Sequence, residues 1–415
     1  MELTQDQDNA AQAIQRWIDC GEEQEFRLAG YAGTGKTTLV QHILDSIDED
    51  PFLACPTGKA AQVLEEKTGR EVSTVHSLLY ATVMTSAERK LDGLLEELEQ
   101  APTNNDLLDA IAALRRTIEK EGPAFTPKSS VDISPGDLLV VDEASMVDDQ
   151  MHQDILRTGA RVLFVGDEGQ LPPVKAQGFF ESNRPHVALD QIVRQALDSP
   201  IIRASMDIRQ GAIPDFMGHG DGEAFVRCPK SKFDHELYLQ ADQIITGKNA
   251  TRRSINQWMR KRLGHTPSPN PTERYHWMPA AGERLICLKN QRWHDPQFVN
   301  GVMCSALGDA KWDDDRMEYT ISLVYEGEAV HDVSMYPYFL QIIYDSEAEP
   351  APFNERRNLC ELDYGYAITA HKAQGSEWDH VILADDELMI NQEDIRRRWL
   401  YTAITRAKQR LVWVY

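Results

Sequence analysis

Residues 26–37, Phe-Arg-Leu-Ala-Gly-Tyr-Ala-Gly-Thr-Gly-Lys-Thr, set the fold expected for this chain. An apolar stretch ends at Gly30, a glycine-rich turn follows, and a helical pattern starts at Thr37. The turn fits the pattern G-x-x-x-x-G-K-S/T and has the strand–turn–helix context that this pattern requires. It therefore predicts a phosphate-binding loop on a parallel α/β sheet.

This loop carries groups suited to a nucleoside triphosphate. Its glycines let backbone N–H groups converge on phosphate, and the helix N-terminus adds positive potential. Lys36 is expected to reach the β- and γ-phosphates, and the Thr37 hydroxyl to bind Mg²⁺. A glycine-rich turn without a ligand is the alternative. The candidate ATP-binding residues here are Gly30, Gly33, Thr34, Gly35, Lys36, Thr37 and Thr38.

Residues 138–143, Leu-Leu-Val-Val-Asp-Glu, supply the acidic partner of such a loop. An apolar strand that ends in two carboxylates places Asp142 to hold Mg²⁺ and Glu143 to act as general base on the attacking water. Two solvated acids at a strand end are the alternative.

Gln7 has two interpretations from its local pattern. Thr4-x-x-Gln7 at the start of an amphipathic helix is a capping box. The Gln amide can also pair with the N6 and N7 edge of adenine. The local pattern leaves both open.

The composition is that of a folded protein with a strong acidic excess. The 415 residues contain 42% hydrophobic residues, 43 Lys+Arg and 66 Asp+Glu, for a net charge of −23. Two or three domains are expected at about 150 residues each. An acidic chain attracts phosphate polyanions weakly, so any nucleic-acid site must be local.

Neither targeting nor disulfides are indicated. The start, MELTQDQDNA, lacks a signal-peptide pattern, and no apolar stretch approaches the ~20 residues that span a bilayer. We expect a cytoplasmic protein that associates with the nucleoid when engaged. The six cysteines form no CxxC pair and are expected to be reduced packing thiols.

The order of patterns along the chain predicts two α/β units with insertions. Strand and helix patterns alternate through the first third, and 138–141 and 161–166 resume that sheet. Two amphipathic helices interrupt it between Thr85 and Lys120. A second α/β unit includes 243–247 and 380–384. Between these, 283–357 contains alternating and apolar runs, among them Tyr338–Tyr344, that indicate antiparallel strands of a small β-barrel.

Several segments, in this order, resemble the motifs of superfamily 1B DNA helicases of the RecD and Dda type, which move 5′→3′. The matching segments are 3–7 (Q motif), 30–37 (motif I), 55–61 (Ia), 74–79 (Ib), 142–146 (II), 166–174 (III), 194–195 (IV), 249–252 (the segment after it), 366–379 (V) and 401–408 (VI).

The resemblance implies two RecA-like domains with insertions. The first domain, 1A, would comprise 1–80 and 136–188, and the second, 2A, 189–282 and 358–415. A helical insertion 1B would cover 81–135, and an SH3-like β-barrel 2B would cover 283–357. Related enzymes often carry a strand-separating pin in the first insertion, whereas this segment is largely helical in pattern, although a short hairpin around Phe125 to Val131 fits as well.

The resemblance also implies roles for single residues. Gln7 would read adenine, Gln170 would sense the γ-phosphate, and Arg194 and Arg406 would act as arginine fingers from the second domain. Gly375 and Glu377 of motif V would join the ATP site. The implied single-stranded DNA contacts are Thr57, Lys59, Thr74, His76, Thr369, His371 and Lys372, with Trp293, Trp378 and Tyr80 as unranked stacking candidates.

The expected function is that of a monomeric, Mg²⁺- and ATP-dependent DNA helicase in replication, recombination or repair. It is expected to act on single-stranded DNA and duplex junctions, with replication or single-strand-binding proteins as candidate partners. The alternatives are an RNA or hybrid translocase, a nucleotide-gated DNA-binding or recruitment subunit, and a ring-forming clamp-loader type ATPase. The last is less consistent with motifs IV to VI lying in the same chain.

Overall fold

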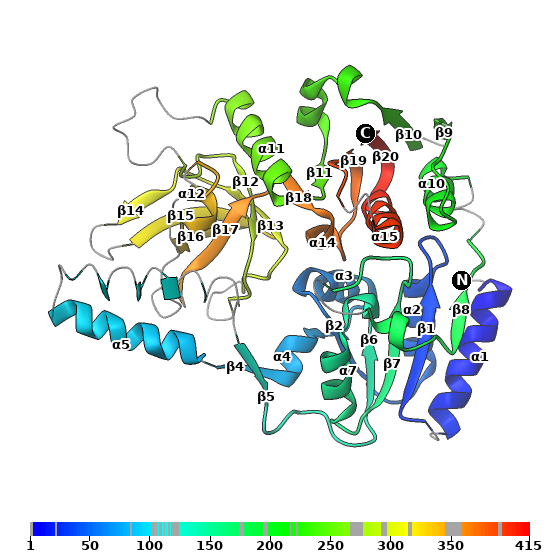
Figure 1. Ribbon diagram of the computed structural model, residues 1–415. Coiled ribbons are helices and arrows are strands. Elements are labelled where there is room, and N and C mark those ends of the chain that lie inside the picture. Colours follow the sequence, from blue (N-terminus) through cyan, green and yellow to red (C-terminus); the bar gives the residue numbers. More distant parts are fainter. Residues whose placement is uncertain are drawn as a thin grey trace. The chain divides into compact units, whose positions relative to one another are not determined.

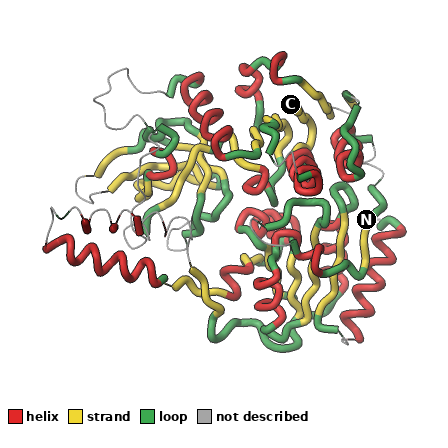
Figure 2. Tube along the Cα trace, viewed as in Figure 1, coloured by secondary structure: helices red, strands yellow, loops and turns green. Residues whose placement is uncertain are grey.

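The computed structural model describes residues 3–20, 23–83, 85–100, 104, 106–107, 110–111, 113–114, 117, 124–173, 178–193, 198–215, 217–220, 223–265, 277–291, 297–313, 318–344, 358–388 and 392–415 (Figures 1 and 2). The chain forms two compact units. Unit 1 comprises Met1–Leu79, Ser129–Arg252 and Ala367–Tyr415, and unit 2 comprises Tyr80–Lys128 and Arg253–Tyr366. The second unit is thus inserted into the first at two places.

The first sheet of unit 1 is a six-stranded parallel sheet that contains the P-loop strand. In spatial order its strands are β3 (Val72–Thr74), β2 (Phe52–Cys55), β6 (Leu138–Val141), β7 (Arg161–Gly166), β1 (Glu25–Gly30) and β8 (Val187–Leu189). The helices of this part include α1 (Gln5–Cys20), α2 (Lys36–Ser46), α3 (Gly58–Thr68), α4 (Val75–Leu79), α7 (Asp149–Leu156) and α8 (Phe179–Ser182). The α/β class with parallel sheets is confirmed.

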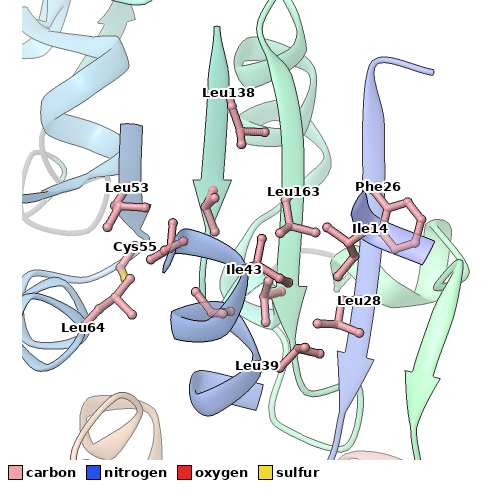
Figure 3. Packing of buried hydrophobic residues seen from close by; sticks show 14 of the residues in the cluster. Ile14, Phe26, Leu28, Leu39, Ile43, Leu53, Cys55, Leu64, Leu138 and Leu163 are labelled. Atoms are coloured by element: carbon pink, nitrogen blue, oxygen red, sulfur yellow. The ribbon is translucent and has the colours of Figure 1, made fainter. Parts of the chain in front are cut away.

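One apolar cluster joins the strands of this sheet to the helices that cover it. Leu28 of β1, Leu39 of α2 and Ile14 of α1 are fully buried in it, and Figure 3 shows them packed together with Ile43 and Leu163. Burial of one such side chain stabilises the fold by about 1.5–3 kcal/mol. The cluster thus fixes the base of the strand–loop–helix segment that forms the P-loop.

The second sheet of unit 1 is also mainly parallel. Its order is β18 (Ala367–Thr369), β11 (Gln243–Thr246), β19 (Trp378–Ala384), β20 (Ala407–Val414), β10 (Glu223–Cys228) and β9 (Gly218–Gly220), with only β9 antiparallel to its neighbour. Its helices include α10 (Pro200–Arg209), α14 (Ala370–Ala373) and α15 (Glu393–Ile404), and α11 (Asn249–Arg262) follows β11.

Unit 2 contains a mostly antiparallel sheet that spans the predicted β-rich insertion 283–357 and includes one strand, β17, just beyond it. Its strands are β13 (Met303–Ala306), β12 (Arg284–Cys287), β17 (Cys360–Tyr364), β16 (Glu328–Tyr336), β15 (Glu318–Tyr325) and β14 (Lys311–Asp313). An additional pairing of β13 with β15 closes five of these strands into a ring, which we call the five-stranded ring. The alternating burial along β15 matches the alternation seen in its sequence.

The prediction of a strand at Tyr338–Tyr344 in this insertion is wrong. Tyr338–Gln341 forms the short helix α12, and turn residues follow to Tyr344. The backbone of Pro337 is already helical, and its carbonyl accepts hydrogen bonds from the N–H groups of Leu340 and Gln341. A short apolar run fits a buried strand and a buried helix equally well, so periodicity alone did not separate them.

The other part of unit 2 combines a helix with a two-stranded ribbon. Strands β4 (Tyr80–Val83) and β5 (Ala124–Pro127) pair antiparallel, and α5 (Ser86–Gln100) follows β4. Leu91 of α5 and Ile111 form a small buried cluster. Much of the second expected helix lies outside the described residues.

Two further sequence expectations concern membranes and cysteines. Among the helices that the structure describes, none has the length and apolar character needed to cross a bilayer. All six cysteines are free thiols, and Cys55, Cys287, Cys304 and Cys360 are buried.

Candidate nucleotide site and nucleic-acid interface

The candidate nucleotide site lies at the carboxyl ends of three adjacent strands of the first sheet. The P-loop follows β1, Asp167 follows β7, and Asp142 follows β6. Since β7 lies between β1 and β6, the parallel arrangement delivers all three segments to one edge. Ligands of open α/β sheets bind at this edge.

The P-loop adopts a conformation that depends on its glycines. Gly33 and Gly35 have φ values of 79° and 75°, where a side chain would be strained. Gly35 is also the N-cap of α2, and it offers no side-chain cap among the described residues. The first N–H groups of α2 are therefore available to an anion.

Lys36 contacts the loop that contains it. Its ammonium donates to the carbonyl oxygen of Gly30 at 2.6 Å and to that of Tyr31 at 3.3 Å, and it lies 3.8 Å from Oδ2 of the buried Asp167. A lysine that reaches phosphates must give up these carbonyls, which are weaker partners than a triphosphate.

Gln7 forms the capping box and also contacts the P-loop. The N–H of Thr4 donates to Gln7 Oε1 at 2.8 Å, and the N–H of Gln7 donates to Thr4 Oγ1 at 3.3 Å. Gln7 Nε2 donates to the carbonyl oxygens of Thr34 at 3.0 Å and Gly35 at 3.4 Å. The buried amide thus fixes the P-loop against α1 through Nε2, while Oε1 belongs to the capping box.

The two carboxylates after β6 lie in a setting that favours their neutral forms. Burial raises the pKa of Asp142, and burial together with the charge of Asp142 raises the pKa of Glu143 to about 7, while the charges of Arg406 and Lys36 act in the opposite direction on Glu143. Glu143 also has a φ of 54°, which is uncommon outside glycine and concentrates at functional sites.

Orphaned polar atoms test whether these residues fit Mg²⁺ and ATP. Glu143 Oε2, Gln170 Oε1 and Ser145 Oγ are buried and have no hydrogen-bond partner among the described residues. Buried polar groups are normally paired, so atoms of this kind at a strand edge point to a polar ligand or water. Together with the free N–H groups of α2 and the hydroxyl of Thr37, they fit a magnesium-bound nucleotide.

Elements of the second sheet bind directly to this site. The hydroxyl of Tyr401 on α15 donates to Asp167 Oδ2 at 2.7 Å and accepts from the N–H of Ala32 at 2.7 Å. One residue further, Thr402 Oγ1 accepts from the N–H of Leu171 at 2.8 Å. Gln374 Nε2 donates to the carbonyl oxygen of Leu171 at 3.0 Å. Motif III is therefore held by side chains from motifs V and VI.

The sequence assigned no role to Asp167 or Tyr401, although both lie inside quoted motifs. Asp167 precedes Gln170, which is buried beside it, and burial raises the pKa of Tyr401 well above its ordinary value. The sequence shows a Tyr in one motif and an Asp in another. A local sequence pattern cannot show that side chains from two different sheets contact each other.

Of the two predicted arginine fingers, Arg406 is described and Arg194 lies outside the described residues. Arg406 is buried and donates to the carbonyl oxygens of Thr402 at 3.0 Å and Ser376 at 3.2 Å and to Thr405 Oγ1 at 3.1 Å. Its guanidinium is thus bonded to its own segment and to motif V in this structure.

The two motif V residues predicted for the ATP site, Gly375 and Glu377, have different surroundings. A Cβ on Gly375, whose φ is 74°, would come within 2.9 Å of the Cβ of Ala60, so this glycine packs directly on α3. Glu377 is exposed. Motif V is thereby in contact with motif Ia.

The candidate DNA-contact residues lie at the carboxyl edges of both sheets. Cys55 of β2 pairs with Thr74 of β3, so the segments that follow these strands emerge side by side. Thr57 caps α3 by accepting from the N–H of Ala60 at 3.2 Å, and Thr74 Oγ1 accepts from the N–H of Ser77 at 3.0 Å. Lys59 Nζ donates to Gln62 Oε1.

The remaining candidates lie at the carboxyl end of β18 of the second sheet and in the helix that follows it. Thr369 precedes α14, which contains His371 and Lys372. Burial lowers the pKa of His371, and burial likewise lowers the pKa of His76 despite the charge of Asp148, so both rings favour the neutral form. The contact of Gly375 with Ala60 joins this segment to the one that contains Thr57 and Lys59.

The stacking candidates are only partly described. Trp293 lies outside the described residues, Trp378 is half-buried in β19, and the Tyr80 ring lies 6.4 Å from the exposed Phe125 ring across the β4–β5 ribbon. The basic run Arg396–Arg398 is only partly a solvated helix face. Arg396 forms an ion pair with the buried Asp385, whereas Arg397 and Arg398 pair with the exposed Asp394.

Comparison with known proteins yields matches to an AAA-domain family and to helicases. A family model described as an AAA domain matches residues 2–230, and one described as a UvrD-like helicase C-terminal domain matches residues 364–414. The ATP-dependent RecD2 DNA helicase of Deinococcus radiodurans is 28% identical over 412 residues, which cover 92% of this chain and 46% of that protein. The phage T4 ATP-dependent DNA helicase dda is 25% identical over 225 residues, with 51% and 43% coverage. The chain thus spans about half the length of these relatives.

Solved structures with a similar fold include Pif1 helicases. A structure described as the basis for unwinding of forked duplex DNA by two coordinating Pif1 helicases matches with a TM-score of 0.53 and 19% identity, covering 99% of this chain and 92% of that one. Pif1 from Candida albicans matches with a TM-score of 0.51 and 17% identity, with 100% and 95% coverage. Because the first family model covers more than half of the sequence, the chain belongs to the AAA domain family, and the named relatives agree with the superfamily 1B helicase motifs identified in its sequence.

Proposed function

We propose that this chain is a DNA-stimulated ATPase that moves 5′→3′ on single-stranded DNA and unwinds duplex ahead of it. The observation that carries the proposal is the contact between the P-loop and the second sheet through Tyr401 and Asp167. A motor requires nucleotide binding on one sheet to change the position of the other, and this contact links the two. The names of the relatives, which are DNA helicases, support the choice of DNA as track.

In this proposal each residue of the site has one task. Backbone N–H groups of the P-loop and Lys36 bind the phosphates, while Thr37 and Asp142 hold Mg²⁺. Bound Mg²⁺ neutralises charge on the phosphates and orients them. Glu143 takes the proton of the attacking water, and its buried setting keeps that water away from bulk solvent. The orphaned amide oxygen of Gln170 is suited to orient the same water.

Arg406 stabilises the charge that develops on the γ-phosphate. It must first leave the carbonyls of Thr402 and Ser376, to which it donates in this structure. A triphosphate is the stronger partner, so ATP binding pulls α15 toward the first sheet, and hydrolysis releases it. Arg194 is proposed as the second finger from its motif alone.

Single-stranded DNA is proposed to cross the carboxyl edges of both sheets. Hydroxyls, backbone amides and a few cations would hold its phosphates without reading sequence, which permits sliding. The contact of Gly375 with Ala60 supports a continuous track from Thr57 and Lys59 to Thr369–Lys372.

We also propose the domain division expected from the sequence, with 1A, 1B, 2A and 2B at the stated boundaries. The five-stranded ring supports assignment of 2B as SH3-like, with its strand β17 lying just past the stated boundary at residue 357. Action as a monomer in the cytoplasm, on junctions in replication, recombination or repair, belongs to the same proposal.

The test is steady-state ATP hydrolysis with and without a single-stranded oligonucleotide, using DNA and RNA of the same sequence and Glu143→Gln as the inactive control. We expect stimulation by DNA that is lost in the variant, followed by unwinding of forked substrates with a 5′ loading strand and not of those with a 3′ strand.

The other outcomes identify the alternatives. Equal stimulation by RNA would favour a hybrid or RNA translocase. Hydrolysis indifferent to nucleic acid would overturn the helicase proposal and leave a nucleotide-gated recruitment subunit, for which Lys36→Ala would abolish turnover and spare partner binding.

A further inference from the structure

We propose that Tyr401 is a positioning residue that couples the P-loop to α15 through Asp167, so that the state of Lys36 is transmitted to Arg406. The inference rests on the proposed function, since it assigns a device to the same site. It concerns a hydroxyl that touches neither nucleotide nor DNA in the mechanism above.

The hydroxyl is placed between two groups of the nucleotide site. It accepts from the N–H of Ala32 inside the P-loop and donates to Asp167 Oδ2, with both distances at 2.7 Å. The other carboxylate oxygen, Oδ1, accepts from the N–H of Gly169 at 2.9 Å. Both Tyr401 and Asp167 are almost completely buried, so these bonds form away from competing water.

Asp167 connects this hydroxyl to Lys36. The ammonium of Lys36 lies 3.8 Å from Oδ2, the same oxygen that accepts from Tyr401. When Lys36 moves to the phosphates, the carboxylate keeps only the Tyr401 hydroxyl and the Gly169 N–H of these donors. A buried carboxylate that loses a cation binds its remaining donors more tightly. Nucleotide binding therefore changes the bond to Tyr401.

The ring is held so that this change reaches α15. A Cβ on Gly169 would come within 3.1 Å of the Tyr401 ring, so the ring packs closely against the motif III backbone and would have to shift to admit a side chain. The next residue, Thr402, binds the N–H of Leu171 through its side chain and Arg406 through its carbonyl. Movement of Tyr401 is thus passed through Thr402 to the arginine finger.

The main test is Tyr401→Phe, which keeps the ring and removes both hydrogen bonds. The matched control is Tyr364→Phe in the five-stranded ring, where another buried hydroxyl donates to the carbonyl oxygen of Trp277 at 2.5 Å. We expect Tyr401→Phe to lower kcat of DNA-stimulated hydrolysis by about tenfold or more, because the arginine is misplaced, with a change of less than about twofold in KM for ATP. Tyr364→Phe should leave kcat and KM as they are in the wild type.

A second experiment measures the coupling between nucleotide binding and DNA binding directly. In the wild type, a non-hydrolysable ATP analogue should change the Kd for a fluorescent single-stranded DNA by about fivefold or more, and in Tyr401→Phe by less than about twofold. Asp167→Asn combined with Tyr401→Phe should lose no more coupling than either change alone, because both act through one bond. If Tyr401→Phe fails to fold, Gly169→Ala displaces the ring by a few tenths of an ångström and tests the same contact.

The results separate the two proposals. If wild-type hydrolysis responds to DNA and Tyr401→Phe behaves as Tyr364→Phe does, the role of Tyr401 is overturned while the motor stands. If the wild type ignores nucleic acid, the motor is overturned, and the kcat–KM split measured without DNA still decides whether Tyr401 positions the catalytic groups.

Discussion

The guanidinium of Arg209 on α10 lies 3.6 Å from the centroid of the Tyr31 ring in the P-loop. The Tyr31 hydroxyl donates to Glu168 Oε1 at 2.6 Å, so this ring joins the P-loop to both the second sheet and motif III. It is a second link between the two sheets, independent of Tyr401.

This link predicts a measurable interaction energy. Arg209→Met and Tyr31→Leu should each lower the free energy of urea unfolding of unit 1. The loss in the double variant should be smaller than the sum of the two single losses by about 0.5–2 kcal/mol. Additivity within about 0.3 kcal/mol would show that the cation and the ring do not interact.

Gly35 should tolerate alanine less well than another glycine with the same backbone conformation. Gly35 and Gly69 have φ values of 75° and 66°, but a Cβ on Gly35 would collide with Gln7 Nε2, whereas one on Gly69 would meet nothing within 4 Å. The left-handed conformation alone costs about 1–2 kcal/mol for alanine. Thermal unfolding should therefore show a larger loss for Gly35→Ala than for Gly69→Ala.

Gln7→Ala provides the check on that comparison. It removes the colliding amide, so adding Gly35→Ala to it should cost about as much as Gly69→Ala costs in the wild type, roughly 1–2 kcal/mol. An unchanged cost would mean that the backbone conformation, and not the amide, limits this position.

Removing one partner of the ion pair between Arg260 and Glu283 should destabilise the fold much more than replacing both partners with apolar residues. Arg260 Nε and Nη2 donate to the two carboxylate oxygens at 2.6 and 2.9 Å, and both side chains are almost fully buried. Glu283→Leu alone strands a buried cation and should destabilise unit 2 by about 3–5 kcal/mol. Arg260→Met with Glu283→Leu should recover most of this loss. Equal losses in the single and double variants would contradict the account.

Glu25 should stabilise the fold in a pH-dependent way. Burial acts to raise the pKa of its carboxyl, but the hydrogen bond and charge of His152 and the charge of Arg27 outweigh burial and lower the pKa below the ordinary 4.5. A depressed pKa contributes stability that is present above the unfolded value and is lost as the pH falls through the folded value. The difference in unfolding midpoint between wild type and Glu25→Gln should therefore be largest near about pH 7 and should shrink below about pH 4. A constant difference would assign the effect to packing.

The parallel sheets could be predicted because local signals agreed with the final arrangement. The strand 26–30, the glycine turn and the helix beginning at Lys36 each have the pattern of the element they form, and the acidic pair after β6 marks the same edge of the sheet. Local preference and tertiary packing point the same way in these segments.

The contacts between motifs could not be predicted in this way. Tyr401 and Asp167 are separated by more than two hundred residues, and their meeting depends on how α15 packs, which no local pattern encodes. Gln7 combines both cases. Its capping box could be predicted from the four residues Thr4 to Gln7, but its hydrogen bonds to the P-loop carbonyls could not. The helix at Tyr338 was missed because its apolar run fits either period.

The five-stranded ring has a consequence for solubility during synthesis. An open sheet exposes a row of unpaired N–H and C=O groups along each outer strand, and a neighbouring chain can add a strand there. Within the described residues of the ring, each of the five strands has a partner on both sides, and β14 pairs outside it with one half of β15. Once the β13–β15 pairing forms, a nascent chain presents little backbone in this region to which a second molecule could attach.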